Sequence, residues 1–325
     1  MVTRLLAAVA AVAAIATGQG AAQEWPTRPI TLVVPYAAGG PADIVTRIVT
    51  PKMSEVLGQQ IIVENLPGAG GMTGAVKVAR AAPDGYTFLQ GPAGVMTQNQ
   101  SLYSHPLYDG ATDFAAIGLI ATAPPILVAR NDMGVNNLQE FIAYVKSHQD
   151  TLKFASAGPG SGPHITCVLL NTALGVNPTH IPYRGSAQAE QDLVASRFDY
   201  MCDFISTALP QINGKTVKAI ATLTRERTPV LPDLATADEQ GLKGFDSPGW
   251  YAFVAPAKTP APVIAKLNSA VVETLADSRV RARLAELGAD IPPREQLTPE
   301  ALRAFQRAEI EKWWPLIKAA GIKAE

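Results

Sequence analysis

The feature that most constrains the fold of this chain is a repeated unit of a short apolar strand, a glycine-rich turn and a helix. In the first unit, the apolar segment 30–35 leads through the turn YAAGGPAD to a helix predicted over 43–57, which Gly58 ends. The stretch FASAGPGSGPHITCVLLNTALG repeats this order. Because strands that alternate with helices form layered α/β structures, the sequence predicts α/β lobes with mainly parallel central sheets.

Further units follow the same pattern along the first 225 residues. QQIIVENLPGAGG precedes a helix predicted over 72–80, and PPILVARND precedes the amphipathic segment NNLQEFIAYVKSH. In THIPYRGSAQAEQDLVASRFDYMCDF, Ser186 is the predicted N-cap of a helix. After Arg227 the chain becomes rich in proline, and the strand GWYAFVAPAKTP then leads to two helices, 261–287 with a break and 299–320.

The N-terminus has the composition of a secretory signal peptide. Arg4 precedes an apolar run over 5–16, and small residues permit a cut after Ala22. The run is shorter than the roughly 20 residues that span a bilayer. Removing residues 1–22 takes away one of the 27 basic residues and none of the 28 acidic ones, which leaves a net charge of −2. Because the sequence has no run of like-charged residues, nothing in it indicates binding to nucleic acid or to an anionic membrane surface.

Two glycine-rich junctions are candidates for binding an anion. Both PYAAGGPAD and SAGPGSGPH stand between a strand and the start of a helix. The first amides of a helix lack partners and carry partial positive charge, and glycines let a ligand approach the backbone closely. Asp43 is predicted to cap the first turn, and Ser161 adds a hydroxyl to the second. The pair indicates a carboxylate or another oxyanion bound between two lobes.

Other sites for chemistry have less support. LPGAGGMTG nearly matches a dinucleotide-binding fingerprint, but its third glycine is Gly74 rather than residue 73, and no acidic residue follows at the required distance. We attribute these glycines to close packing of a helix on a strand. The four histidines lack metal-binding spacing, so we expect no metal and no cofactor. Ser161 lacks the flanking glycines of a nucleophile elbow, although His164 follows in the first helical turn.

Cys167 and Cys202 are an even number of cysteines in an exported chain, where disulfides persist. The predicted elements place one on a helix and the other on a nearby strand of the same lobe. A disulfide between them is favoured, and two buried free thiols are the alternative.

The motifs together resemble the receptors of the tripartite tricarboxylate transporter family, also called Bug receptors. The resemblance covers nearly the whole mature chain and rests on WPTRPITLVVPYAAGGPADIVTR, VENLPGAGGMTGAVKVARAAPDGYTFL, FASAGPGSGPH, TRERTPVLPDLATADEQGL and APAKTPAPVIAKLN. It implies a periplasmic binding protein of the two-lobed type II, or Venus flytrap, class that closes on a carboxylate. It also implies delivery of that solute to a membrane permease of two subunits.

The resemblance further implies which residues bind the ligand. One loop holds the carboxylate from the first lobe, a second loop from the other lobe, and the strand-to-loop segment GPAGVMTQNQ forms part of the distal wall. The predicted set is Tyr36, Ala37, Ala38, Gly39, Gly40, Asp43, Ala93, Gly160, Ser161, Gly162, His164 and Asp203. The distal segment is apolar at Ala93, Val95 and Met96, which suits an aromatic or longer-chain carboxylate better than citrate or aspartate. The expected ligand is a small carboxylic acid, with a dicarboxylate or an aromatic carboxylate favoured.

The leading prediction is therefore a binding protein and not an enzyme, with the first lobe formed by 23–124 and 229–325 and the second by 125–228. A monomer is expected. One alternative is a ligand-loaded co-sensor for a membrane histidine kinase. Another is an exported hydrolase that uses Ser161 and His164.

Overall fold

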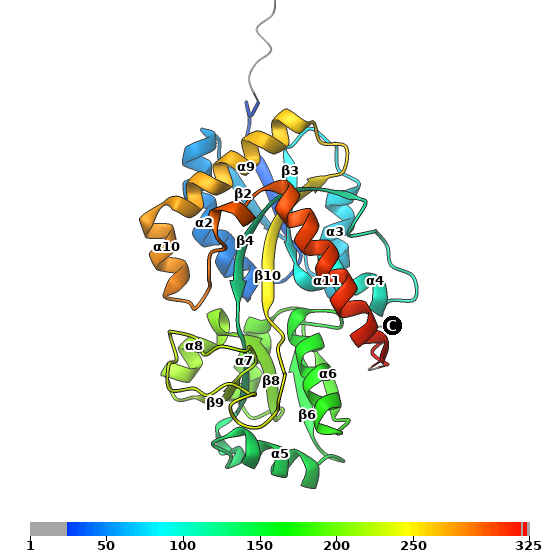
Figure 1. Cartoon of the computed structure of the whole chain (residues 1–325), viewed down its shortest axis with the longest axis vertical. Coiled ribbons are helices and arrows are strands. Elements are labelled where there is room, and N and C mark those ends of the chain that lie inside the picture. Colours follow the sequence, from blue (N-terminus) through cyan, green and yellow to red (C-terminus); the bar gives the residue numbers. More distant parts are fainter. Residues whose placement is uncertain (1–24, 320, 324–325) are drawn as a thin grey trace, which may run out of the picture.

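The computed structural model describes residues 25–319 and 321–323, so the predicted signal peptide and its cut after Ala22 lie outside the described residues. The chain forms two lobes, each built on a five-stranded sheet with order β2-β1-β3-β10-β4 or β7-β6-β8-β5-β9. In Figure 1 the lobes lie one above the other, and β4 and β10 run along the upper lobe toward the lower one.

The first lobe contains the N-terminal and C-terminal parts of the chain. Its elements are β1 (Ile30–Val34), α2 (Pro41–Leu57), β2 (Ile61–Asn65), η1 (Ala69–Gly71), α3 (Met72–Ala79), β3 (Thr87–Pro92), η2 (Gly94–Gln98), α4 (Asn99–Leu102), β4 (Phe114–Ala123), β10 (Gly249–Pro256), α9 (Ala261–Ala276), α10 (Ser278–Ala285), η4 (Arg294–Gln296) and α11 (Pro299–Ala319). The break predicted in the penultimate helix occurs at Asp277, whose carboxylate caps α10 by accepting from the amides of Arg279 and Val280.

The second lobe contains the middle of the chain. Its elements are β5 (Pro125–Arg130), η3 (Asn131–Met133), α5 (Leu138–Ser147), β6 (Lys153–Ser156), α6 (Gly162–Leu174), β7 (Thr179–Pro182), α7 (Ser186–Val194), β8 (Tyr200–Phe204), α8 (Ile205–Asn213) and β9 (Val217–Thr222). Gly185 and not Ser186 is the N-cap of α7, because the Ser186 hydroxyl donates to the Asp203 carboxylate instead of accepting from the helix.

Both sheets are mixed but mainly parallel, as predicted, because four of the five strands in each sheet run in the same direction. The strand–helix units pair in parallel: β1 with β2 and β3, and β6 with β7 and β8. The strands next to the interlobe crossings pair antiparallel, as β10 does with β3 and β4, and β5 with β8 and β9. Only β10 and β5 therefore run against the other strands of their sheets, since each pairs antiparallel with both of its neighbours.

The chain returns to the first lobe later than the predicted boundary at 229. Val230, Leu231 and Leu234 pack on one apolar cluster of the second lobe, and Leu242 and Phe245 pack on the other. Residues up to the start of β10 at Gly249 thus cover the second sheet. The proline-rich composition of this segment gave no sign of the sheet on which it packs.

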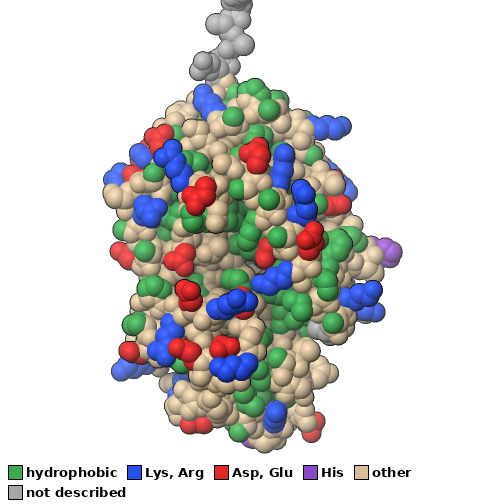
Figure 2. Space-filling model, in the orientation of Figure 1, with side chains coloured by type: hydrophobic (Ala, Val, Ile, Leu, Met, Phe, Trp, Pro, Cys, Tyr) green, Lys and Arg blue, Asp and Glu red, His purple; other side chains and the backbone are tan. Residues whose placement is uncertain are grey.

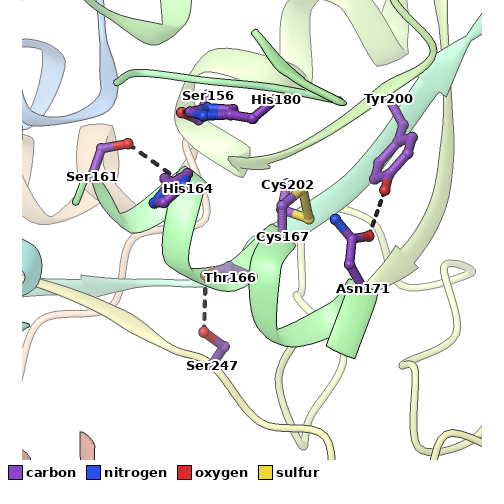
Figure 3. Close-up of a disulfide and its surroundings, with 10 residues drawn as sticks. All are labelled: Ser156, Ser161, His164, Thr166, Cys167, Asn171, His180, Tyr200, Cys202 and Ser247. Atoms are coloured by element: carbon purple, nitrogen blue, oxygen red, sulfur yellow. Dashed lines mark hydrogen bonds between the residues drawn. A yellow bond between two sulfur atoms is a disulfide. The ribbon is translucent and has the colours of Figure 1, made fainter. Parts of the chain in front are cut away.

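A disulfide joins Cys167 of α6 to Cys202 of β8, with a Cα–Cα distance of 5.3 Å, which confirms the predicted pairing. Both residues are fully buried in the cluster between α5, α6 and the sheet (Figure 3). The bridge therefore fixes α6 to the second sheet. Over the described part of the chain, no helix is long and apolar enough to cross a membrane.

Candidate functional site

A small cavity lies between the lobes, where the first residues of several helices meet. Pro41 of α2, Gly162 of α6 and Ser186 of α7 line it, as does Phe204, the N-cap of α8. The cavity volume is about 30 Å³. These ends follow the carboxyl ends of β1, β6, β7 and β8, the usual ligand position in open α/β sheets. Four helix N-termini together create a positive potential without any basic side chain.

The loop of the first lobe is held by the Asp43 carboxylate. Its Oδ2 accepts from the Gly39 amide at 2.9 Å, and its Oδ1 accepts from Asn65 Nδ2 at 2.9 Å. Arg47 Nε donates to both oxygens at 2.9 Å. Burial raises the pKa of Asp43, but the bonds from Arg47, Gly39 and Asn65 outweigh that effect and hold it below its usual value. Asp43 therefore caps the turn, as predicted, and shapes the loop.

The loop of the second lobe is held by a buried histidine, His164, and a half-buried one, His180 (Figure 3). His164 Nδ1 accepts from the Gly160 amide at 3.2 Å, which assigns the imidazole hydrogen to Nε2. His180 Nε2 lies 2.7 Å from Ser156 Oγ, which in turn accepts from the Gly158 amide at 3.1 Å. The two imidazoles therefore fix the backbone of the turn.

Both imidazoles are neutral over most of the pH range. Burial, with a smaller contribution from His180, lowers the pKa of His164 to about 3. Burial lowers the pKa of His180 to about 4. Their rings lie 4.5 Å apart and also contact the ring of Phe154. An apolar stack of neutral rings thus supports this loop, and it supplies no positive charge to a ligand.

Ser161 is the N-cap of α6 and is not arranged as a nucleophile. Its Oγ donates to the Gly158 carbonyl at 2.6 Å and accepts from the His164 amide at 3.4 Å. The His164 imidazole accepts from Gly160 and has no hydrogen bond to Ser161 Oγ within the described chain. The serine–base hydrogen bond that the hydrolase alternative requires is therefore not formed between these two residues.

Five of the twelve predicted residues line the cavity, and the other seven do not. The wall contains Tyr36, Gly40, Ala93, Ser161 and Gly162. The residues that do not line the cavity are Ala37, Ala38, Gly39, Asp43, Gly160, His164 and Asp203. The amides of Ala37, Gly39 and Gly160 already have acceptors. In contrast, the amides of Gly40 and Gly162 have no acceptor in the part of the chain that the structure describes.

Several wall residues were missed by sequence reasoning. Trp250 and Tyr251 come from β10, and Phe204 and Ser186 from the second lobe. Tyr251 and Phe204 have ring centroids 5.9 Å apart and meet across the lobes. GWYAFVAP indicated a strand, but nothing in its pattern indicated that its first residues lie beside the loops of another lobe.

Glycines permit the close approach of the two lobes. A Cβ on Gly70 would lie 2.1 Å from the carbonyl oxygen of Pro159, and one on Gly94 would lie 2.5 Å from that of Gly160. Tyr103 Oη donates to the same Pro159 oxygen at 3.0 Å, and the Ala37 amide donates to the Arg184 carbonyl at 3.3 Å. The structure is thus a closed arrangement of the lobes.

The glycines of LPGAGGMTG have two roles. Gly74 fits the predicted packing role, because its Cβ would lie 2.9 Å from the Cα of Pro35. Gly70, in contrast, faces the second lobe.

Charged side chains are absent from the cavity wall among the described residues. The described residues also contain no cluster of three or more histidine, cysteine or acidic side chains that could hold a metal ion. Figure 2 shows acidic and basic side chains intermixed on one face of the molecule, without a large patch of one sign. The exposed surface of the cavity wall is almost entirely apolar, and the polar groups of its lining residues are uncharged backbone, hydroxyl and indole groups.

Comparisons with known proteins agree with this architecture. The model of the tripartite tricarboxylate transporter family receptors matches residues 45–322. A UPF0065 protein of Agrobacterium vitis, from the TAR-I ttuE–ttuC′ intergenic region, is 41% identical over 93% of this chain and 87% of its own length. The solved periplasmic binding protein BugD is 42% identical, with a TM-score of 0.90 over 93% of this chain and 100% of its own.

A second solved structure, MatC from Rhodopseudomonas palustris with bound malate, is 43% identical. It has a TM-score of 0.88 over 90% of this chain and 100% of its own. The matching family model is that of a receptor, and together with the likeness to these solved structures it confirms the two-lobed periplasmic binding fold and a binding function without catalysis. The chain belongs to the receptor family of the tripartite tricarboxylate transporters.

Proposed function

We propose that this protein captures a small dicarboxylate or aromatic carboxylate between its lobes and delivers it to a membrane permease of two subunits. The observation that carries the proposal is the convergence of helix N-termini on an interlobe cavity without charged side chains among the described residues of its wall. A carboxylate there would be compensated by amides and helix dipoles, as anions at helix N-termini commonly are. MatC, a relative with a similar fold, binds malate.

The unpartnered amides of Gly40 and Gly162 suit the two oxygens of one carboxylate. Gly40 belongs to the first lobe and Gly162 to the second. A carboxylate that accepts from both would link the lobes, and its binding energy would stabilise the closed state. Each charge-assisted bond contributes about 1.5–3 kcal/mol. Closure also removes water from the carboxylate, which strengthens these bonds.

The proposal is tested at Gly40, where substitution by proline replaces the amide hydrogen with a ring carbon and so removes the donor. Gly40 has φ −81° and ψ 172° and already precedes a proline, so proline and alanine both fit its conformation. Gly40→Pro should weaken acid binding about 10-fold or more, from the loss of one charge-assisted bond. Gly40→Ala keeps the amide and is the matched control.

Binding is measured by isothermal titration calorimetry against a library of mono-, di- and aromatic carboxylates, with the corresponding primary amides as uncharged controls. If both Gly40 variants bind the acid equally well, the Gly40 amide does not donate to the ligand. Binding of amides as tightly as acids would contradict carboxylate recognition. Delivery is measured as uptake of the bound acid by the two-subunit permease in vesicles, with and without the receptor.

A further inference from the structure

A buried carboxylate already occupies two of the four helix N-termini at the cavity. Asp203, the fourth residue of β8, has no exposed surface. Ser186 Oγ, at the start of α7, donates to its Oδ1 at 2.6 Å, and Thr207 Oγ1, in the first turn of α8, donates to its Oδ2. Asp203 thus neutralises the positive ends of α7 and α8. Only the ends of α2 and α6 remain for the carboxylate of a ligand.

Glu190 of α7 lies beside Asp203, and the two carboxyl groups together carry one negative charge, because Glu190 is protonated. Its side chain is 3% exposed, and its oxygens have no hydrogen-bond donor within the described chain. Burial and the neighbouring Asp203 charge raise the pKa of Glu190 well above its usual value. Burial also raises the pKa of Asp203, but the Ser186 and Thr207 hydroxyls oppose that rise. Glu190 is therefore the member of the pair that keeps its proton, and Asp203, whose two oxygens accept from hydroxyl groups, carries the negative charge.

This pair determines what Ser186 offers to the cavity. A serine hydroxyl has one hydrogen, and Ser186 donates it to Asp203. Ser186 also lines the cavity, so a ligand group that reaches its oxygen meets lone pairs. A second carboxylate there would be repelled both by these lone pairs and by the Asp203 charge behind them. A neutral hydrogen-bond donor would be accepted.

Tyr251 of β10 supplies the complementary group from the other lobe. Its side chain is 2% exposed and lines the same cavity, and its hydroxyl has no partner among the described residues. Burial, with a smaller contribution from the Asp203 charge, raises the pKa of its hydroxyl, so it remains a donor. Since the cavity volume is about 30 Å³, small ligand groups within it lie close to both walls. A buried unpaired hydroxyl costs about 1–3 kcal/mol, which a ligand acceptor would recover.

We propose that Ser186 and Tyr251 select a carboxylic acid that also bears a hydroxyl group, which accepts from Tyr251 and donates to Ser186. This inference rests on the proposed function and narrows its ligand class. A keto group would satisfy Tyr251 but has no hydrogen for Ser186. An ammonium group would donate to Ser186 but leaves the Tyr251 hydroxyl unpaired, and an unsubstituted acid satisfies neither. The hydroxyl would bond to both lobes and so favour closure.

The test compares matched ligands by calorimetry with the full mature protein. The pairs are lactate and propionate, L-malate and succinate, and 4-hydroxybenzoate and benzoate, and oxaloacetate and L-aspartate are added as keto and amino analogues. In the pair that binds best, the hydroxy acid should bind at least about 10-fold more tightly than its partner. Tyr251→Phe should reduce that ratio to near 1, mainly by weakening the hydroxy acid.

Tyr251→Phe removes an unpaired hydroxyl, so it should fold as stably as the natural protein. Tyr108→Phe is the control, because it removes a buried hydroxyl that donates to the Val95 carbonyl outside the cavity wall. The hydroxy-acid preference should survive in this control. A preference that is absent in the natural protein, or that persists in Tyr251→Phe, would overturn the inference and leave the proposed function intact. Failure of every acid to bind would overturn both.

Discussion

Replacing Gly70 by alanine should prevent the lobes from closing without unfolding either lobe. Gly70 lies in the first lobe, where its carbonyl accepts from Tyr36 Oη at 3.2 Å and from Asn99 Nδ2 at 3.1 Å. A Cβ at this position would lie 2.1 Å from the Pro159 oxygen of the second lobe. An ordinary contact needs about 3.4 Å, so these atoms must separate by 3.4 − 2.1 = 1.3 Å. Because Gly70 is held within its own lobe, the second lobe must move away.

The expected loss of affinity follows from the bonds that span the lobes. A separation of this size breaks the bond from Tyr103 to Pro159 and carries the Gly162 amide out of reach of a carboxylate that Gly40 holds. The loss of one charge-assisted bond at about 1.5–3 kcal/mol and of one neutral bond at about 0.5–1.5 kcal/mol weakens binding by about 30-fold or more. The substitution also imposes a left-handed conformation on alanine, since Gly70 has φ +61°. That costs about 1–2 kcal/mol of stability and does not by itself affect binding.

Gly58→Ala separates these two effects. Gly58 has φ +67° at the end of α2, and a Cβ there would meet nothing within 4 Å. Both variants should therefore lose similar thermal stability, and only Gly70→Ala should lose affinity, as measured by calorimetry with the tightest-binding acid. Small-angle scattering with that acid should show a larger radius of gyration for Gly70→Ala. If the two variants bind within 3-fold of each other, the closure argument is wrong.

Three further predictions concern residues that do not line the cavity. His164 has a pKa near 3 when folded and about 6.5 when unfolded, so its contribution to stability is present above pH 6.5 and is lost as pH falls toward 3. When the pH is lowered from 7.5 to 5, the free energy of unfolding measured with urea should fall by about 2 kcal/mol more for the natural protein than for His164→Asn. An equal fall for the two proteins would contradict this. Replacing both Cys167 and Cys202 by alanine opens a bridge across 35 residues and should lower the free energy of unfolding by about 4 kcal/mol, with acid affinity unchanged; a loss below 1 kcal/mol would show that the bridge contributes little. Asp43→Asn weakens the bonds that hold Gly39 and Arg47 and should lower acid affinity about 10-fold in calorimetry, and unchanged affinity would show that the loop keeps its shape without the carboxylate.

The sequence by itself determined the local units of this protein. The turns before α2 and α6, the Asp43 cap and the break before α10 depend on residues within a few positions of one another, and all were predicted. Capping, glycine turns and apolar periodicity act over such short distances, so they can be recognised in one sequence. The resemblance to a receptor family then supplied the arrangement of the two lobes.

Only the tertiary structure decided which groups face the cavity. Tyr251 and Ser186 are 65 residues apart, and they line the same cavity because β10 returns to the first sheet beside the loops of the second lobe. The structure likewise shows that the Gly39 and Gly160 amides are occupied, whereas those of Gly40 and Gly162 are not within the described residues. Such facts depend on strand order and on how two lobes close, and the periodicity of a single segment carries no information about either.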